Sequence, residues 1–480
     1  MRTRGRLIVL TAIVVIAGSS ALLAGACGSK RGADVSRGRA TQAASVAAEA
    51  HSLSPLPERE LSPELDRMRL RVMQRVAGAR ELAWVSEPRM IELTGWEYGT
   101  RAHEMTEMLG GEELRALSRL AVAGGMLSEG TDLATLAAGF TAASASAIYS
   151  PFDKRVLLVA QERGKSSSSK SSSSKSSPSS SSSSSSSSTP PSSTGAADES
   201  LLAHEFTHAL QDQHFELLKL LNAKPYNFDR SEAAFAVVEG DAMNVEHRVE
   251  EGDAAWAHRT PEEIARIEEA RFSAFRKELG ALFPALLTET FIFRYRDGSR
   301  LVETARRRGG ERAVDELFAR PPASSEQVLH PQKYFANEQP REAQFDATKL
   351  NATGWRESVS TPLGELGARG LLLKSLSRME AERAAAGWGG DRAYLFERGA
   401  GEMLFVWQTA WDRTDDAREF FRAYNALQLA RGATAGARSR EHENLAEKVW
   451  RDDGTITRVR IEGDSVLVLR GREQDVDAAL

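Results

Sequence analysis

The chain of 480 residues contains a single cysteine, Cys27, so it can form no intramolecular disulfide and no cysteine-based metal cluster. It also lacks an excess of positive charge, because 62 Lys and Arg stand against 67 Asp and Glu and leave a net charge of -5. Proteins that bind nucleic acid usually present a basic surface, so we expect no nucleic-acid partner. The ligands left for a metal site are the nine histidines and the carboxylates.

The N-terminus has the layout of a secretory signal peptide. Three arginines, the last of them Arg6, precede the apolar run LIVLTAIVVIAGSSALLA, and small residues then lead to Cys27. The stretch LAGAC resembles a bacterial lipobox, which implies that residues 1–26 are removed and that Cys27 is lipidated and anchors the protein to a membrane. An uncleaved anchor is the alternative, because the run is just short of the roughly 20 residues that span a bilayer. Both alternatives predict export to the bacterial cell envelope, on the periplasmic side or at the cell surface.

Composition divides the rest of the chain into regions. Residues 27–60 are rich in small and polar residues without apolar periodicity, which predicts a flexible tether. Residues 61–345 show mostly helical periodicity and include a Ser-rich stretch, in which 22 of the 28 residues from 166 to 193 are Ser. We expect a disordered loop over 164–197, because nothing in it can bury apolar surface. Residues 360–475 alternate helix and hairpin patterns and predict a compact α+β unit.

One segment carries a pattern of catalytic chemistry. AHEFTHAL contains H-E-x-x-H, in which His204 and His208 are four residues apart. On a helix their imidazoles project from the same face and can converge on one zinc ion. Glu205 then lies beside the metal, where its carboxylate can take a proton from a water and pass it to a leaving amine. The composition predicts roughly 0.02 chance matches. Two histidines paired for structural reasons are the alternative.

A third ligand decides between these alternatives. Glu239 follows the H-E-x-x-H by about thirty residues and emerges from an apolar run, in VVEGDA, on the next amphipathic helix. A carboxylate at a core-facing position is costly unless something compensates it, and a zinc ion would do so. An exposed helix-surface acid is the alternative for this residue.

An H-E-x-x-H helix followed by a glutamate in an E-G-x-A setting resembles the gluzincin group of zinc metallopeptidases. HEFTHALQDQHF, VVEGDA and SSEQVLHPQKY are also similar to a group of bacterial predicted metallopeptidase lipoproteins, over roughly residues 148–335. The resemblance implies that His204, His208 and Glu239 bind Zn²⁺ and that Glu205 is the catalytic acid and base. The chain has neither the N-E-x-x-S-D nor the G-x-M-E-N motif of particular gluzincins, so peptide selectivity is unassigned.

The fold that this resemblance implies is α+β and zincin-like. It is mostly helical, with a small sheet whose edge strand runs beside the H-E-x-x-H helix. A turn-forming Ser-Pro-Phe-Asp-Lys between two apolar segments predicts consecutive strands or a hairpin, and residues 155–160 are the expected edge strand. Such a strand would bind the backbone of a protein or peptide substrate by β-augmentation.

Several residues are second candidates for the site. Asp212 or Asp241 could accept a hydrogen bond from the second nitrogen of a ligand histidine, as zinc ligands usually require, and a solvated helix acid is the equal alternative. His330 could donate to the oxyanion of a tetrahedral intermediate, with Tyr295 a further candidate, although a loop-stabilising histidine is the more common case. The expected core of the last unit includes Trp388, Trp407, Trp411 and Trp450.

The sequence therefore predicts a zinc-dependent peptidase of the cell envelope. The alternative is a non-catalytic envelope lipoprotein that keeps a metallopeptidase-like scaffold for binding or assembly.

Overall fold

The computed structural model describes residues 53–144, 146–160, 199–279, 283–399, 401–435, 440–442, 445–452 and 454–480. The predicted signal peptide, the predicted lipidation site Cys27, most of the predicted tether and the Ser-rich loop lie outside these residues. The described chain combines many helices with two sheets, so the α+β class is confirmed. None of the helices in this part of the chain is long and apolar enough to cross a membrane.

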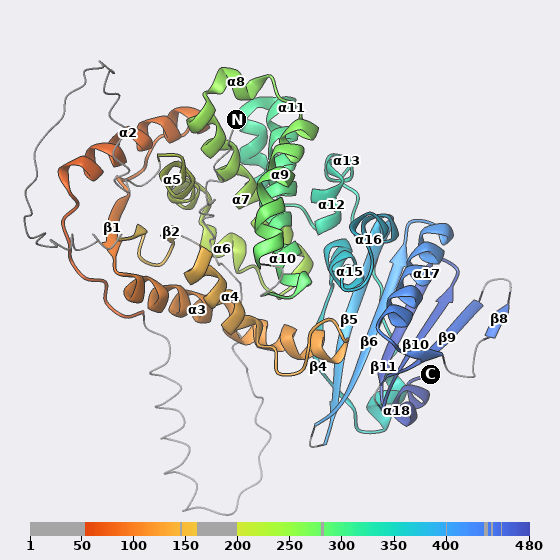
Figure 1. The fold of residues 1–480 in the computed structure, drawn as a ribbon. Coiled ribbons are helices and arrows are strands. Elements are labelled where there is room, and N and C mark those ends of the chain that lie inside the picture. Colours follow the sequence, from red (N-terminus) through yellow and green to blue (C-terminus); the bar gives the residue numbers. More distant parts are fainter. Residues whose placement is uncertain are drawn as a thin grey trace, which may run out of the picture.

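The region up to residue 345 is mainly helical (Figure 1). Its helices are α2 (Pro63–Arg80), α3 (Gly95–Ala123), α4 (Leu133–Ser144), α5 (Glu199–Phe215), α6 (Leu217–Leu221), α7 (Phe228–Glu251), α8 (Asp253–Ala257), α9 (Pro261–Leu279), α10 (Ala285–Ile292), the π-helical turn η2 (Phe293–Asp297), α11 (Gly298–Ala319), α12 (Ser325–Leu329) and α13 (Pro331–Phe335). Helix α7 packs against both α5 and α11, and α2 packs against α5. Local sequence sets the helix starts: Asn227, for example, accepts the Arg230 N–H and caps α7.

A small sheet lies beside α5. Strand β2 (Ala147–Ser150) and strand β3 (Arg155–Val159) form the predicted hairpin, and β1 (Arg89–Leu93) pairs in parallel with β3. The strand order β1-β3-β2 makes β3 the central strand, so the prediction that residues 155–160 form the edge strand is wrong. Its continuous run of buried Val and Leu suits a strand that is covered on both sides. The edge strand that contacts α5 is β2.

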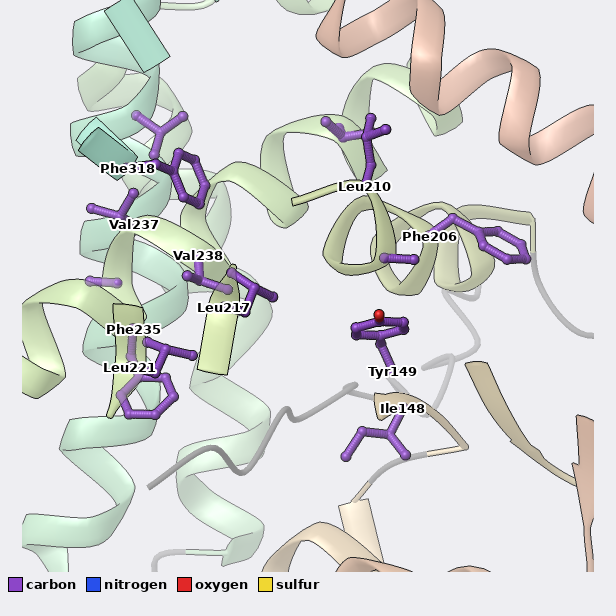
Figure 2. Close-up of a cluster of buried hydrophobic side chains, with 14 of the residues drawn as sticks. Ile148, Tyr149, Phe206, Leu210, Leu217, Leu221, Phe235, Val237, Val238 and Phe318 are labelled. Carbon is purple, nitrogen blue, oxygen red and sulfur yellow. The ribbon is translucent and has the colours of Figure 1, made fainter. Parts of the chain in front are cut away.

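The core of this region joins the sheet to the two central helices. Figure 2 shows Tyr149 of β2 directed at α5, whose Phe206 and Leu210 lie near it, with Val237 and Val238 of α7 in the same cluster. Each of these side chains is at most 2% exposed. Helix α5 is therefore held by its apolar residues, which leaves its polar face free for the two histidines.

The C-terminal region contains a larger sheet. Its strands are β4 (Arg356–Thr361), β5 (Trp388–Arg398), β6 (Glu402–Trp411), β7 (Thr434–Ala435), β8 (Arg440–His442), β9 (Leu445–Asp452), β10 (Thr455–Glu462) and β11 (Ser465–Gly471). They follow the order β4-β5-β6-β11-β10-β9-β7, with β8 also paired to β9, and the neighbouring strands are antiparallel.

Helices cover both faces of this larger sheet (Figure 1). They are α14 (Thr348–Ala352), α15 (Gly364–Leu372), α16 (Arg378–Ala385), α17 (Thr414–Ala430) and α18 (Glu473–Ala478). Alternation along β6 places Trp407 in the core under α15, α16 and α17, and its neighbour Val406 in the core that includes α14 and α18. All four tryptophans predicted for the core are buried.

Helix α3 connects the two regions. Met105 and Leu109 belong to the core that contains α5, whereas Leu117 and Leu120 belong to a core of the larger sheet. Between the two halves the helix is kinked at Gly110, whose φ of 153° is accessible to glycine and strained for other residues. The far end of α3 thereby reaches the C-terminal sheet.

Two glycines allow α7 and α11 to approach closely. A β-carbon on Gly240 would lie 2.1 Å from the carbonyl carbon of Gly298, and one on Gly298 would lie 2.0 Å from the carbonyl oxygen of Ala236. Gly240 directly follows Glu239, so this backbone contact holds the segment that carries the predicted third ligand.

We expect Gly240→Ala to lower the free energy of unfolding by about 3 kcal/mol, at the upper end for an overpacked core, because the added carbon meets backbone atoms that cannot rotate away. Gly78→Ala, in the interior of α2, is the matched control. No atom lies within 4 Å of the added carbon there, so we expect stabilisation of about 0.5–1 kcal/mol from the loss of glycine's chain entropy. Urea denaturation measures both variants, and equal midpoints would contradict the packing argument.

Candidate metal centre

Helix α5 presents His204 and His208 on one face, and Glu239 comes from the facing helix α7. Nε2 of His204 lies 3.3 Å and Nε2 of His208 lies 3.5 Å from Oε2 of Glu239. One ligand atom from each of these residues lies within 4.8 Å of the others. The structure therefore brings together the three residues that the sequence predicted as metal ligands.

The three candidate ligands and Glu205 are buried. His204 is 1% exposed, and Glu205, His208 and Glu239 are fully inaccessible. Nε2 of His208 and Oε1 of Glu205 have no hydrogen-bond partner. Buried polar atoms without partners are unusual in folded proteins and require an explanation such as an ion. A cation between the imidazoles and Glu239 would satisfy the ring nitrogen and compensate the buried carboxylates.

Hydrogen bonds orient both histidines. Nδ1 of His204 lies 3.1 Å from Oε2 of Glu246, and Nδ1 of His208 lies 2.9 Å from Oε1 of Gln211. Both partner atoms are acceptors, so each Nδ1 carries the hydrogen and donates it. Nε2 is then the nitrogen of each ring that faces Glu239, which is the arrangement that metal-binding histidines need.

The prediction that Asp212 or Asp241 accepts a hydrogen bond from a ligand histidine is wrong, because Glu246 and Gln211 take these positions. Asp212 instead accepts the Tyr149 hydroxyl at 2.7 Å and the Lys154 ammonium at 2.6 Å. Asp241 contacts Gln211 and not the histidine itself. It accepts a hydrogen bond from Nε2 of Gln211 at 2.9 Å and forms a buried ion pair with Arg80.

Sequence reasoning missed Glu246 and Gln211. A periodicity signal was present: Glu246 follows Glu239 by two helical turns and Gln211 follows His208 by about one, so each shares a face with its ligand. Many other polar residues satisfy the same spacing, and only the packing of α5 on α7 distinguishes these two. Glu246 is itself held by Arg271, whose Nη2 donates to it at 2.7 Å.

Of the two residues predicted as candidates for oxyanion stabilisation, Tyr295 lies against a candidate metal ligand and His330 contacts a different carboxylate. Tyr295 lies in η2 with its ring stacked on His204, at a centroid separation of 6.0 Å and an interplanar angle of 22°. Burial and then the charges of Glu239 and Glu205 raise the pKa of Tyr295 well above its usual value, so it stays a protonated donor. Nε2 of His330 lies 3.0 Å from Oε2 of Glu365, a carboxylate outside the cluster of candidate ligands, and this contact favours the alternative of a structural histidine.

The surroundings of Glu205 and Glu239 shift the pKa values of these two carboxyl groups in opposite directions. Burial, reinforced by the charge of Glu239, raises the pKa of Glu205 to about 8 even though the Tyr149 backbone N–H donates to its Oε2. For Glu239 burial acts in the same direction, but His208 and His204 outweigh it and lower the pKa to about 2. The arrangement thus holds one ionised carboxylate between the imidazoles and, beside it, one carboxyl group able to exchange a proton near neutral pH.

Comparison with known proteins concerns the other region of the chain. Residues 348–480 match the family model of a domain of unknown function (DUF8575). This match spans the larger sheet with its helices, and the metal centre on α5 and α7 lies before it. No curated protein and no solved structure matches the chain.

Proposed function

We propose that the protein is a zinc-dependent peptidase of the bacterial cell envelope, with a zincin-like catalytic region. The observation that carries the proposal is the convergence of two Nε2 atoms and a carboxylate from α5 and α7, with Glu205 beside them. Two histidines and a glutamate are one of the ligand sets of catalytic zinc sites, which keep an open position for water or substrate.

His204, His208 and Glu239 would hold the metal, and their donor set fits it. Both imidazoles are fixed with Nε2 toward the centre, and Glu239 is ionised between them. Zinc bound there supplies Lewis-acid chemistry, since it polarises a carbonyl and lowers the pKa of a water.

Glu205 would act as general base and then as general acid. Its neighbour His204 is a ligand, but Glu205 itself is absent from the ligand cluster, and its Oε1 has no partner. The backbone N–H of Tyr149 holds the other oxygen, so the carboxyl group is oriented by the edge strand β2. A carboxyl group in this position can take a proton from a water and return it to a leaving amine. Tyr295 would donate its hydroxyl to the developing oxyanion.

The edge strand β2 would position the substrate backbone. It is an outer strand of the small sheet and contacts α5. A peptide added along it by β-augmentation would lie beside Glu205. Because the four central side chains are buried, a peptide reaches them only when neighbouring segments move, so the proposal includes an opening step.

The envelope location is also part of the proposal. It rests on the apolar segment and the lipobox-like stretch before Cys27. Membrane attachment through a lipidated Cys27 would present the metal centre to envelope proteins or peptides as substrates.

The deciding experiment combines metal analysis with a peptide library. We expect about one zinc ion per chain and cleavage of a subset of peptides that stops when a chelator removes the metal. Mass spectrometry of the products also separates endopeptidase from exopeptidase action. Zinc binding with no cleavage of any pool would support the alternative, a non-catalytic lipoprotein that uses this scaffold for binding or assembly.

We expect Glu246→Gln to weaken zinc binding by about 10–100-fold, because the amide accepts the Nδ1 hydrogen of His204 less strongly and loses its ion pair with Arg271. Competition with a chromophoric chelator measures the affinity. Glu250→Gln, at an exposed position of the same helix, removes the same charge and serves as control. An unchanged affinity in Glu246→Gln would show that this contact does not orient the ligand.

A further inference from the structure

A pocket lies where α3 reaches the C-terminal sheet, and none of its lining residues belongs to the metal centre. Its volume is about 380 Å³, within the range of small-molecule sites. The lining residues used below are Val122, Gly125, Leu127, Met403, Arg431 and Arg470.

Three cationic groups meet around Gly125: Arg431 and Arg470 line the pocket, and Lys374, which does not line it, reaches the same glycine. A β-carbon on this glycine would lie 3.0 Å from Nη2 of Arg431 and 3.3 Å from Nε of Arg470, so both guanidinium groups approach its backbone. The Lys374 ammonium donates to the Gly125 carbonyl oxygen at 2.9 Å. Gly125 has a φ of 70°, a conformation that favours glycine.

These cations are poorly neutralised by the protein. Nη1 of Arg431 is buried without a hydrogen-bond partner, and within the described chain Arg431 forms no ion pair. Arg470 donates to the Thr457 hydroxyl, and its ion pair with Asp452 is long, at 4.0 Å.

The carboxylates of the pocket do not supply the missing partner. Glu402 is held by Arg398 at 2.7 Å and by Arg472 at 2.6 Å, so its charge is already matched. Glu129 also lines the pocket, but its side chain is exposed to solvent, where its charge is screened.

The positive charges of Lys374, Arg431 and Arg470 repel one another. Partial burial and the charges of Arg431 and Arg470 lower the pKa of Lys374 to about 8. Partial burial and Arg431 also lower the pKa of Arg470. A bound anion would reverse this unfavourable interaction and would give the buried Nη1 an acceptor.

We propose that this pocket binds a phosphate monoester, with the phosphate between Arg431 and Arg470 and the organic group against Val122, Leu127 and Met403. Guanidinium groups match phosphate oxygens in geometry, and a phosphate monoester carries nearly two negative charges at pH 7. That charge suits two cations, Arg431 and Lys374, that have no carboxylate partner. The site is independent of the proposed peptidase activity.

Calorimetric titration of the full-length protein with phenyl phosphate tests the proposal. We expect saturable binding at one site, and about tenfold weaker binding in Arg431→Gln, because this variant loses a charge-assisted hydrogen bond to the phosphate. Arg418→Gln, at an exposed position of the neighbouring helix α17 paired with Asp415, removes the same charge and should leave the affinity unchanged. The melting temperature of Arg431→Gln without ligand should be unchanged or higher, because this variant loses an unpaired cation and remains folded.

Three outcomes would overturn the proposal. The first is the absence of saturable phenyl phosphate binding, and the second is an equal affinity of Arg431→Gln and the unmodified protein for phenyl phosphate. The third is a loss of affinity in Arg418→Gln as large as that in Arg431→Gln, which would indicate only general attraction to positive charge. Vesicles that contain phosphatidic acid identify the source of the phosphate. Displacement of phenyl phosphate by vesicles supports binding of a lipid headgroup in the pocket, and binding of phenyl phosphate without displacement supports a soluble ester.

Discussion

Glu205→Gln is expected to lower peptidase turnover by about 10²–10⁴-fold while zinc stays bound, because general acid–base catalysis contributes about that much. The amide has nearly the shape of the carboxylate and can still accept the Tyr149 backbone N–H, so the helix and the ligands should keep their positions. It cannot take a proton from water. Initial rates on a peptide identified from the library, together with metal analysis of the same sample, measure the two properties separately.

The control for this prediction is Glu216→Gln. Glu216 lies just after α5 and is exposed, so the variant changes the charge equally and should keep full activity. Turnover in Glu205→Gln within twofold of the unmodified protein would refute the role of this residue. Loss of zinc together with loss of activity would instead show that Glu205 supports the metal site.

Glu239→Gln is expected to remove stoichiometric zinc, because the neutral amide cannot compensate a dication in a buried site. The expected zinc content falls from about one ion per chain to a trace after dialysis. Zinc should raise the melting temperature of the unmodified protein, since a ligand at a hundred times its dissociation constant stabilises by about 2.7 kcal/mol. The variant should lose this zinc-dependent shift.

Glu250→Gln again serves as the matched control on α7, and we expect it to bind zinc and to show the full thermal shift. A variant at Glu239 that retains one zinc ion would mean that the metal is held elsewhere. The H-E-x-x-H histidines would then need another third ligand, and the proposed enzymatic mechanism would lose its basis.

The relation between His204, Glu205 and His208 could be predicted from the sequence because it is local. A helix fixes the relative directions of side chains up to one turn apart, whatever surrounds it. Glu239 was predictable for a related reason, since a carboxylate in an apolar run that packs inward needs a compensating partner. The hairpins β5–β6 and β9–β10 of the C-terminal sheet were also indicated by local pattern, because in each a short turn separates two segments rich in strand-forming residues.

The order of strands in the small sheet was not predictable in this way. Strand β1 pairs with β3 although helices α3 and α4 separate them along the chain. Parallel pairing of this kind depends on how the connecting helices pack, and no residue within β3 shows which neighbour it will acquire. Strand β2 is therefore the edge strand beside α5, and its Tyr149 provides the backbone N–H that orients Glu205.

The sequence by itself determined the helix that carries two histidines and a glutamate, and the acidic residue expected to face them. Only the tertiary structure decided that Glu246 and Gln211 orient the imidazoles, that Asp212 binds Tyr149 instead, and that His330 bonds Glu365. The physical reason is the range of the interactions. Side-chain direction along one helix follows from backbone geometry. The contact of Glu246 with His204, and the bonds by which α7 holds Gln211, depend instead on the separation and rotation of α5 and α7.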